Sequence, residues 1–248
     1  MKVKKIALTA ILTALAFVLY EFLVIKIPPT NPFLSLSLGI IPIFFIAYYC
    51  GILNAIIGAV VADLLGYFLV GASSSPFHPG FTFNALLSGL IFGFILHYKE
   101  KLDGKKGKTM IIIIEILITL ITIPLFSYYF IKTDLGAGKG GISLLITIDI
   151  FAFLLNFSVI LYMLLSSNSL GSNAIVLSYI VYLYIVSLCL TPLWVLSYTE
   201  GLNFFYFWLM RLITVPLQVI IYSLITKLIL IPLSKISKVK KEEHTKIQ

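Results

Sequence analysis

The sequence predicts an all-α protein, a polytopic integral membrane bundle of about eight helices. Hydrophobic residues occupy 60% of its 248 positions and charged residues only 11%, and the mean hydropathy is +1.08. A soluble domain carries about 25% charged residues, so this chain has too little polar surface to fold in water. The composition therefore excludes a cytosolic enzyme, a nucleic-acid-binding protein and a secreted disulfide scaffold.

Apolar segments of membrane-spanning length account for most of the chain. A spanning helix needs about 20 mostly apolar residues. The second and third segments are joined so tightly at Cys50 and Gly51 that they must form a helical hairpin, and the last one contains Arg211, Pro216 and Gln218. In chain order the candidates are 6–25, 34–50, 52–72, 81–98, 109–131, 142–165, 174–198 and 203–231.

The distribution of basic residues predicts the orientation. Fourteen lysines lie at the ends of the chain and in the loops on one side, three lie on the other side, and Arg211 lies within a helix, which accounts for all 18 Lys and Arg. Cytoplasmic loops carry an excess of Lys and Arg. We therefore expect a multi-pass membrane protein with both termini in the cytoplasm.

Motifs of catalysis and metal binding are absent from the sequence. There is no Walker A sequence, no HExxH and no GxSxG. The three histidines are separated along the chain, and Cys50 and Cys189 have no spacing suited to a metal. The sequence thus predicts neither an enzyme nor a metal or cofactor site, and any use of ATP would fall to partner subunits.

Ionisable residues inside the predicted spans are candidates for function, because burying them in a bilayer is costly. With a rise of about 1.5 Å per residue, Arg211 lies roughly 12 Å and Asp63 roughly 14 Å below the outer helix ends. Arg211 is therefore predicted either to pair with Asp63 or Asp149 or to meet an anionic group of a ligand. Glu115 lies at a different level, and Glu21 is expected to reach the lipid headgroups.

Small residues form stripes on two of the predicted helices. Gly58, Ala62 and Gly66 share one face of the third, and Gly89 and Gly93 share one face of the fourth. Such stripes allow close helix approach, and packing within the chain is the interpretation they favour.

The outer loops, by contrast, are rich in proline and aromatic residues. These can wall a pocket for a flat ring, and proline lowers the ordering cost of binding.

Five segments resemble the substrate-binding (S) components of energy-coupling factor (ECF) transporters. Ala10–Ala14 is similar to their AxxxA helix, Leu38–Pro42 to their second helix and Gly58–Gly66 to their third. Pro79–Gly93, which begins PGFT, resembles the signature and fourth helix of the folate family. Arg211–Gln218 resembles the last helix of that family.

The resemblance implies a vitamin-binding subunit that works with a separate energising module. That module would be one transmembrane coupling protein and two ATPases, and Ala10 and Ala14 would face the coupling protein. By motif or by position, the residues expected to form or cover the vitamin pocket are Asn31, Phe77, His78, Pro79, Gly80, Phe81, Asn84, Trp194, Tyr198 and Arg211.

The resemblance also predicts the organisation of the chain and its substrate class. Residues 1–103 would be helices 1–4 of a six-helix core, 104–171 an inserted transmembrane hairpin, 172–232 helices 5–6, and 233–248 a basic cytoplasmic tail. Folate or a related pterin is the expected substrate, with pantothenate or hydroxymethylpyrimidine as alternatives. A membrane enzyme acting on lipids and a secondary transporter are less favoured, because no catalytic groups converge and no internal repeat is evident.

Overall fold

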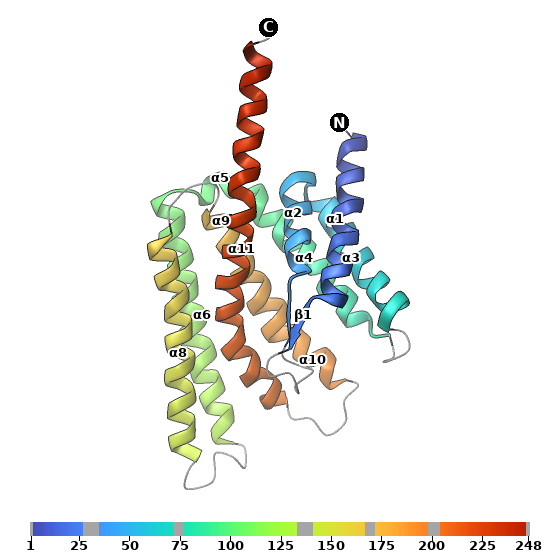
Figure 1. Ribbon diagram of the computed structural model, residues 1–248. Helices are drawn as coiled ribbons and strands as arrows, with labels where there is room; N and C mark the ends of the chain where they lie inside the picture. The colour runs from blue at the N-terminus through green and yellow to red at the C-terminus, as the bar shows by residue number, and fades with distance from the viewer. Residues whose placement is uncertain are drawn as a thin grey trace.

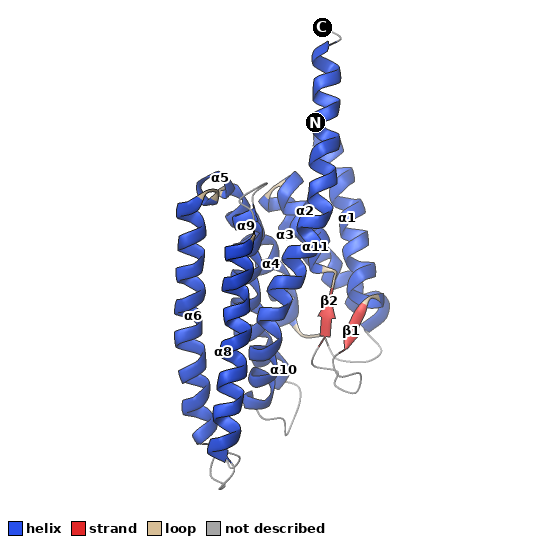
Figure 2. Ribbon diagram, turned by 60° about the vertical axis from the view of Figure 1, so that its left-hand side comes forward, coloured by secondary structure: helices blue, strands red, loops and turns tan. Residues whose placement is uncertain are grey.

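The computed structural model describes residues 2–26, 35–71, 77–132, 141–166, 172–197 and 204–246. Within these residues the chain is a bundle of long helices with one short β-hairpin (Figures 1 and 2). Seven of the described helices are long and apolar enough to cross a membrane, and one shorter apolar helix accompanies them. The predicted fold class is thus confirmed, but the segment expected to span the membrane at 34–50 contains a helix of only 11 residues.

The first half of the chain builds four helices and the β-hairpin. Helix α1 spans Lys2–Phe22, followed by strands β1 (Val24–Lys26) and β2 (Ser35–Ser37), which pair antiparallel. Next come α2 (Ile40–Cys50), α3 (Ile52–Gly66) with a π-helical end η1 (Tyr67–Gly71), α4 (Pro79–His97) and the short α5 (Lys99–Leu102).

The second half adds a helical pair and two further membrane segments. The pair is α6 (Lys105–Ile131) and α8 (Gly141–Leu165). The next segment is continuous and has three parts: α9 (Ser172–Tyr182), the π-helix η2 (Leu183–Leu190) and α10 (Thr191–Leu196). Finally, α11 runs from Phe204 to Lys246, so the helix continues through the segment predicted as a basic tail.

Glycines allow the close packing of the early helices. Gly51 has a φ of 94° and connects α2 to α3 in the tight hairpin expected from the sequence. On α4, a β-carbon at Gly89 or Gly93 would lie 2.6 Å from atoms of α3, including its backbone. These stripes therefore pack within the chain, as predicted.

The two ends of the bundle differ in composition. Both termini and α5 lie at one end, and the β-hairpin and α10 lie toward the other (Figure 1). The end with the termini carries the lysines of the α4–α6 connection, from Lys99 to Lys108. The structure therefore gathers the segments with excess lysine at one end of the bundle.

Besides the longer α11, the start of α2 differs from the predicted boundary. The sequence predicts a helix from residue 34, whereas the structure begins α2 at Ile40. Residues Ser35–Ser37 instead pair with Val24–Lys26 across the intervening segment. Two strands of three residues each leave too little alternation for a sequence pattern to detect.

Candidate functional site

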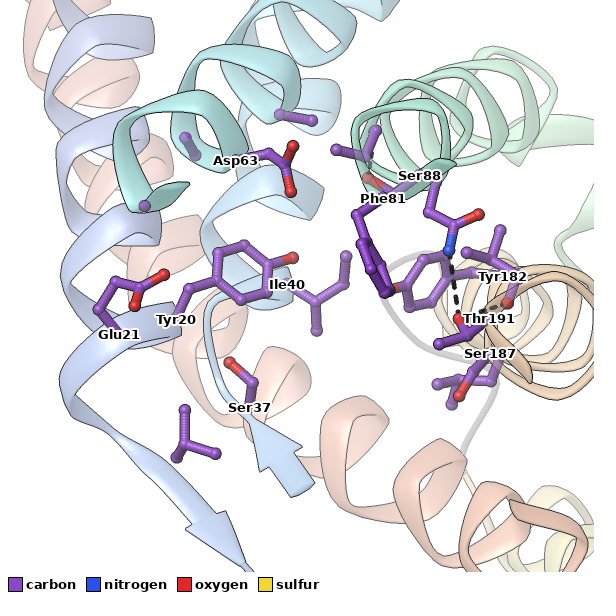
Figure 3. Close-up of a pocket in the computed structure, with 18 of the residues that line it drawn as sticks. Tyr20, Glu21, Ser37, Ile40, Asp63, Phe81, Ser88, Tyr182, Ser187 and Thr191 are labelled. Atoms are coloured by element: carbon purple, nitrogen blue, oxygen red, sulfur yellow. Dashed lines mark hydrogen bonds between the residues drawn. The ribbon is translucent and has the colours of Figure 1, made fainter. Parts of the chain in front are cut away.

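A cavity of about 450 Å³ lies among the helices, within the size range of small-molecule sites. Its wall comes from α1–α4, the β-hairpin, η1, α9, η2, α10 and α11, and no described residue of α6 or α8 is among those lining it. Figure 3 shows the interior. The lining residues are Tyr20, Glu21, Val24, Ser37, Ile40, Ala59, Ala62, Asp63, Gly66, Tyr67, Phe77, His78, Phe81, Asn84, Ala85, Ser88, Tyr182, Leu183, Val186, Ser187, Thr191, Arg211, Gln218 and Tyr222.

Aromatic rings from six different segments line this cavity. Tyr20 projects from α1 on one side, and Phe81 and Tyr182 lie across from it (Figure 3). Tyr67 and Phe77 pack edge to face with ring centroids 5.1 Å apart. Aromatic walls of this kind suit a flat, conjugated ring, because large apolar faces are buried at little cost in side-chain entropy.

Two glycines make room for side chains on the α1 wall. A β-carbon at Gly39 would lie 2.6 and 2.7 Å from the two Cδ atoms of Tyr20, closer than non-bonded carbons approach. At Gly66, a β-carbon would lie 3.3 Å from the carboxyl carbon of Glu21 and nearer still to one of its oxygens. Small residues at these two positions therefore let Tyr20 and Glu21 stand beside the cavity.

Polar groups of α4 and α10 form a linked set of hydrogen bonds. Trp194 Nε1 donates to Asn84 Oδ1 at 3.1 Å, and Asn84 Nδ2 donates to Thr191 Oγ1 at 3.2 Å. Thr191 Oγ1 in turn donates to the carbonyl oxygen of Val186 at 2.8 Å. Because the indole N–H can only donate, Trp194 fixes which way the Asn84 amide faces. Asn84 and Thr191 line the cavity, whereas Trp194 is not among the lining residues and is joined to them through its bond to Asn84.

His78 is the N-cap of α4 and also lines the cavity. Its Nδ1 accepts from the Gly80 backbone N–H at 3.1 Å, and its Nε2 lies 2.7 Å from Ser197 Oγ. A nitrogen that accepts from an amide carries no hydrogen, so Nε2 is the protonated nitrogen and donates to Ser197. Ser197 Oγ donates to the carbonyl oxygen of Trp194 at 2.6 Å, which ties the start of α4 to the end of α10.

Two acidic side chains and one guanidinium are among the described residues that line the cavity: Glu21, Asp63 and Arg211. Asp63 Oδ2 accepts from Thr82 Oγ1 at 2.7 Å. Arg211 donates from a terminal guanidinium nitrogen to Ser187 Oγ, while its Nε is buried without a hydrogen-bond partner among the described residues. The buried Nε is therefore one donor that the hydrogen bonds of the described side chains leave unsatisfied.

The predicted ion pairs of Arg211 do not form between the described side chains. Asp63 lies on α3, bonded to Thr82, and Arg211 lies on α11. Asp149 lies on α8, where its Oδ2 accepts from Ser127 of α6 at 2.7 Å. A similar predicted depth therefore does not bring two side chains together when their helices direct them toward different neighbours.

Glu21 also differs from expectation. The sequence places it at the headgroups, but the side chain is half-buried and lines the cavity near Asp63. Its position follows from the β-hairpin, which starts two residues after α1 and brings Val24 and Ser37 to the same wall.

The remaining predicted site residues fall into three groups. Phe77, His78, Phe81 and Asn84 line the cavity, as does Arg211. Pro79 and Gly80 form the first turn of α4, where Gly80 leaves space for the Trp194 ring. Asn31 and Tyr198 lie outside the described residues.

Ala10 and Ala14 lie on the exposed face of α1. The same helix buries Thr13 and Ala16 on its other face, against the bundle. A surface of small residues on the outside of the bundle is available to a partner helix.

Several lining residues belong to no sequence motif that would mark them as site residues. Tyr182 and Tyr222 belong to apolar runs in which an aromatic residue facing lipid looks the same as one facing a cavity. Ser187 and Gln218 are polar positions within predicted spans, and polarity at that depth is the one sequence feature that marks them.

The fold and the site together define a class: a multi-pass membrane protein that encloses a small-molecule cavity among its helices. The comparison with protein families gives a match to ECF-type riboflavin transporter, S component, over residues 1–166. The chain therefore belongs to this family of S components. It is a vitamin-binding transporter subunit and not an enzyme, and its partners as a class are the components of an ECF module.

A solved structure supports the fold. The crystal structure of FolT bound with folic acid matches with a TM-score of 0.52 over 90% of this chain and 90% of that chain, at 22% identity. The comparison with curated protein sequences gives no match.

The family match extends across α6 and α8 and ends before α9. That α6 and α8 are an insertion into a six-helix core remains a prediction.

Proposed function

We propose that this S component binds riboflavin or a closely related flavin and delivers it for uptake by an ECF module. The observation that carries the proposal is the aromatic and polar cavity of about 450 Å³ in a chain of the riboflavin S component family. The tyrosine and phenylalanine walls suit a fused three-ring system.

The polar groups of the cavity suit the rest of a flavin. The carboxylates of Glu21 and Asp63 accept hydrogen bonds, and the hydroxyl groups of a ribityl chain can donate to them. The Arg211 guanidinium, which also lines the cavity, is a donor for ring carbonyls or ring nitrogens. These three described side chains carry two negative charges and one positive charge. A neutral ligand adds no further negative charge to them.

Folate or a related pterin is the second candidate, and one residue favours it. Arg211 lines the cavity, and the planar fork of its guanidinium matches a carboxylate. The fold is also similar to that of FolT. Glu21 and Asp63 would then face the amino group of the pterin, while the glutamate carboxylates add negative charge to a wall that already carries two acids.

Titration of the purified protein with riboflavin and with folic acid tests the proposal. Trp194 is bonded to the cavity residue Asn84, whereas Trp208 packs against Phe126, which is not in the lining. Saturable quenching by riboflavin should therefore survive in Trp208→Phe and be largely lost in Trp194→Phe. Saturation by folic acid alone would replace riboflavin with the second candidate, and saturation by neither would refute both.

Arg211→Gln separates the two ligands further. The guanidinium is charged with either ligand, so its hydrogen bond contributes about 1.5–3 kcal/mol. Glutamine can replace that bond with a neutral one of about 0.5–1.5 kcal/mol to riboflavin, but it leaves a folate carboxylate without its opposite charge. Riboflavin affinity should fall roughly 2- to 10-fold and folate affinity roughly 10- to 150-fold. A merely structural Arg211 would instead lower the yield of folded protein without changing the affinity of what remains.

The same proposal includes the cellular arrangement. The end of the bundle with excess lysine faces the cytoplasm of a bacterium, and the cavity opens toward the outside. A coupling protein docks on the α1 face with Ala10 and Ala14, and two ATPase subunits supply the energy. Vesicles containing this chain alone should bind the vitamin and fail to accumulate it.

A further inference from the structure

A second group of polar side chains is buried where α6, α8 and η2 meet. Glu115 of α6 is 1% exposed, Asn156 of α8 is 0% exposed and Tyr184 of η2 is 5% exposed. Tyr184 Oη lies 3.1 Å from Glu115 Oε1 and is also hydrogen-bonded to Asn156 Oδ1. None of the three lines the cavity described above.

The number of hydrogens available in this group fixes the protonation of Glu115. Asn156 Nδ2 donates to the carbonyl oxygen of Ala152 at 2.7 Å, so Oδ1 is the atom that faces Tyr184. An amide oxygen can only accept, so the single phenolic hydrogen of Tyr184 is used on Asn156. The bond between Tyr184 and Glu115 then has no hydrogen unless Glu115 supplies one.

The electrostatic surroundings agree with this count. No salt bridge joins Glu115 to a Lys or Arg among the side chains that the structure describes, and its second oxygen, Oε2, is buried without a hydrogen-bond partner there. An ionised carboxylate in such a place would be uncompensated, and the usual outcome is that the group becomes neutral. A neutral carbonyl oxygen without a partner is far less costly than an anionic one.

We propose that Glu115 is a proton-binding site, a neutral carboxylic acid whose O–H donates to Tyr184 and holds the α6–α8 pair against η2. A metal cation is a poor alternative occupant, because the direct contact between Tyr184 and Asn156 leaves no space between their oxygens. The hydrogen-bonded series runs from Glu115 through Tyr184 to Asn156, so both helices of the pair are joined to η2.

The position of Tyr184 connects this site to the vitamin cavity. Its neighbour Leu183 lines the cavity, and Ser187, three residues further along η2, also lines it and accepts from Arg211. The protonated Glu115 therefore supports the cavity wall from the far side. This inference does not depend on which vitamin is bound.

Infrared difference spectroscopy tests the protonation directly. The spectrum of the wild-type protein minus that of Glu115→Gln is recorded at about pH 7, where an ordinary glutamate with a pKa near 4.3 is ionised. We expect a positive carbonyl band of a protonated carboxylic acid, shifted in D₂O. A carboxylate band in its place would overturn the proposal. Asp149→Asn is the matched control, and its removal should leave the Glu115 band unchanged.

Thermal unfolding in detergent tests the locking role, and it requires no ligand. Glu115→Gln keeps an N–H donor for Tyr184 and should leave the midpoint nearly unchanged. Glu115→Leu has no donor and should lower the midpoint by roughly 4 °C or more. Equal midpoints for Gln and Leu would show that the donated hydrogen does not hold the helices together. Because both readouts are made without vitamin, a failure here is distinct from a failure of the riboflavin assignment.

Discussion

Replacing Gly39 with alanine should weaken vitamin binding through one neighbouring side chain. Gly39 precedes α2 with φ −61° and ψ −21°, a conformation that alanine adopts without strain. The added methyl group would lie 2.6 and 2.7 Å from the two Cδ atoms of Tyr20. Since non-bonded carbons rest about 3.5–4.0 Å apart, the ring must move by about 1 Å.

The direction of that movement determines the effect on binding. Tyr20 lines the cavity together with Glu21 of the same helix and Ile40 of α2 (Figure 3). A ring displaced away from residue 39 either enters the cavity or shifts α1. Overpacking of this size costs about 1–3 kcal/mol, which corresponds to a loss of roughly 5- to 150-fold in affinity if the ligand-bound state carries the whole cost.

A double-mutant cycle with Tyr20→Ala is the assay. Riboflavin dissociation constants are measured for the wild type, each single variant and the pair. If Gly39 acts through the tyrosine ring, Gly39→Ala should cost almost nothing in the Tyr20→Ala background, and the coupling should exceed about 0.5 kcal/mol.

Additive effects of the two changes would refute the reasoning. They would mean that the methyl group acts on the start of α2 rather than on the ring. If the Gly39→Ala protein binds as tightly as the wild type, the Tyr20 ring or α1 must move at no cost to binding. Tyr20 would then not determine the shape of the cavity.

Three further predictions concern other parts of the molecule. Trp194→Phe keeps a ring beside Gly80 but loses the bond to Asn84, so affinity should fall roughly 2- to 10-fold in a radioligand assay, and unchanged affinity would exclude a positioning role. Bulky substitution of Ala10 or Ala14 should spare binding and abolish uptake by cells, whereas joint loss would indicate internal packing. Gly89→Val should reduce the yield of folded protein because its side chain meets the backbone of α3, and a normal yield would contradict close α3–α4 packing.

Hydropathy predicts the fold of this chain well because the bilayer constrains it strongly. Each span must satisfy its own backbone hydrogen bonds, so long apolar runs become helices. The β-hairpin cannot be predicted in this way. The pairing of Val24 with Ser37 joins two segments that are separated in the sequence, and no local pattern links them.

The cavity is predicted in part, and the reason is geometric. Phe81 of the PGFT motif and Arg211 of the last helix both line the cavity, so these two motifs lead to residues of its wall. Depth along a helix can be counted from the sequence, but the direction in which a side chain points around the bundle cannot. Arg211 and Asp63 therefore have similar predicted depths, yet no hydrogen bond or salt bridge joins them among the described side chains, and Asp149 is bonded within the α6–α8 pair.

Two walls of the cavity differ in how readily they can move. On one wall, Val24 and Ser37 lie opposite each other in the β-ladder, so neither withdraws from a ligand unless backbone hydrogen bonds break. On the other, Val186 and Ser187 belong to the π-helix η2, a rare backbone form that accommodates an extra residue per turn. A transition of η2 toward regular α-helix would rotate these two side chains while the ladder stays in place.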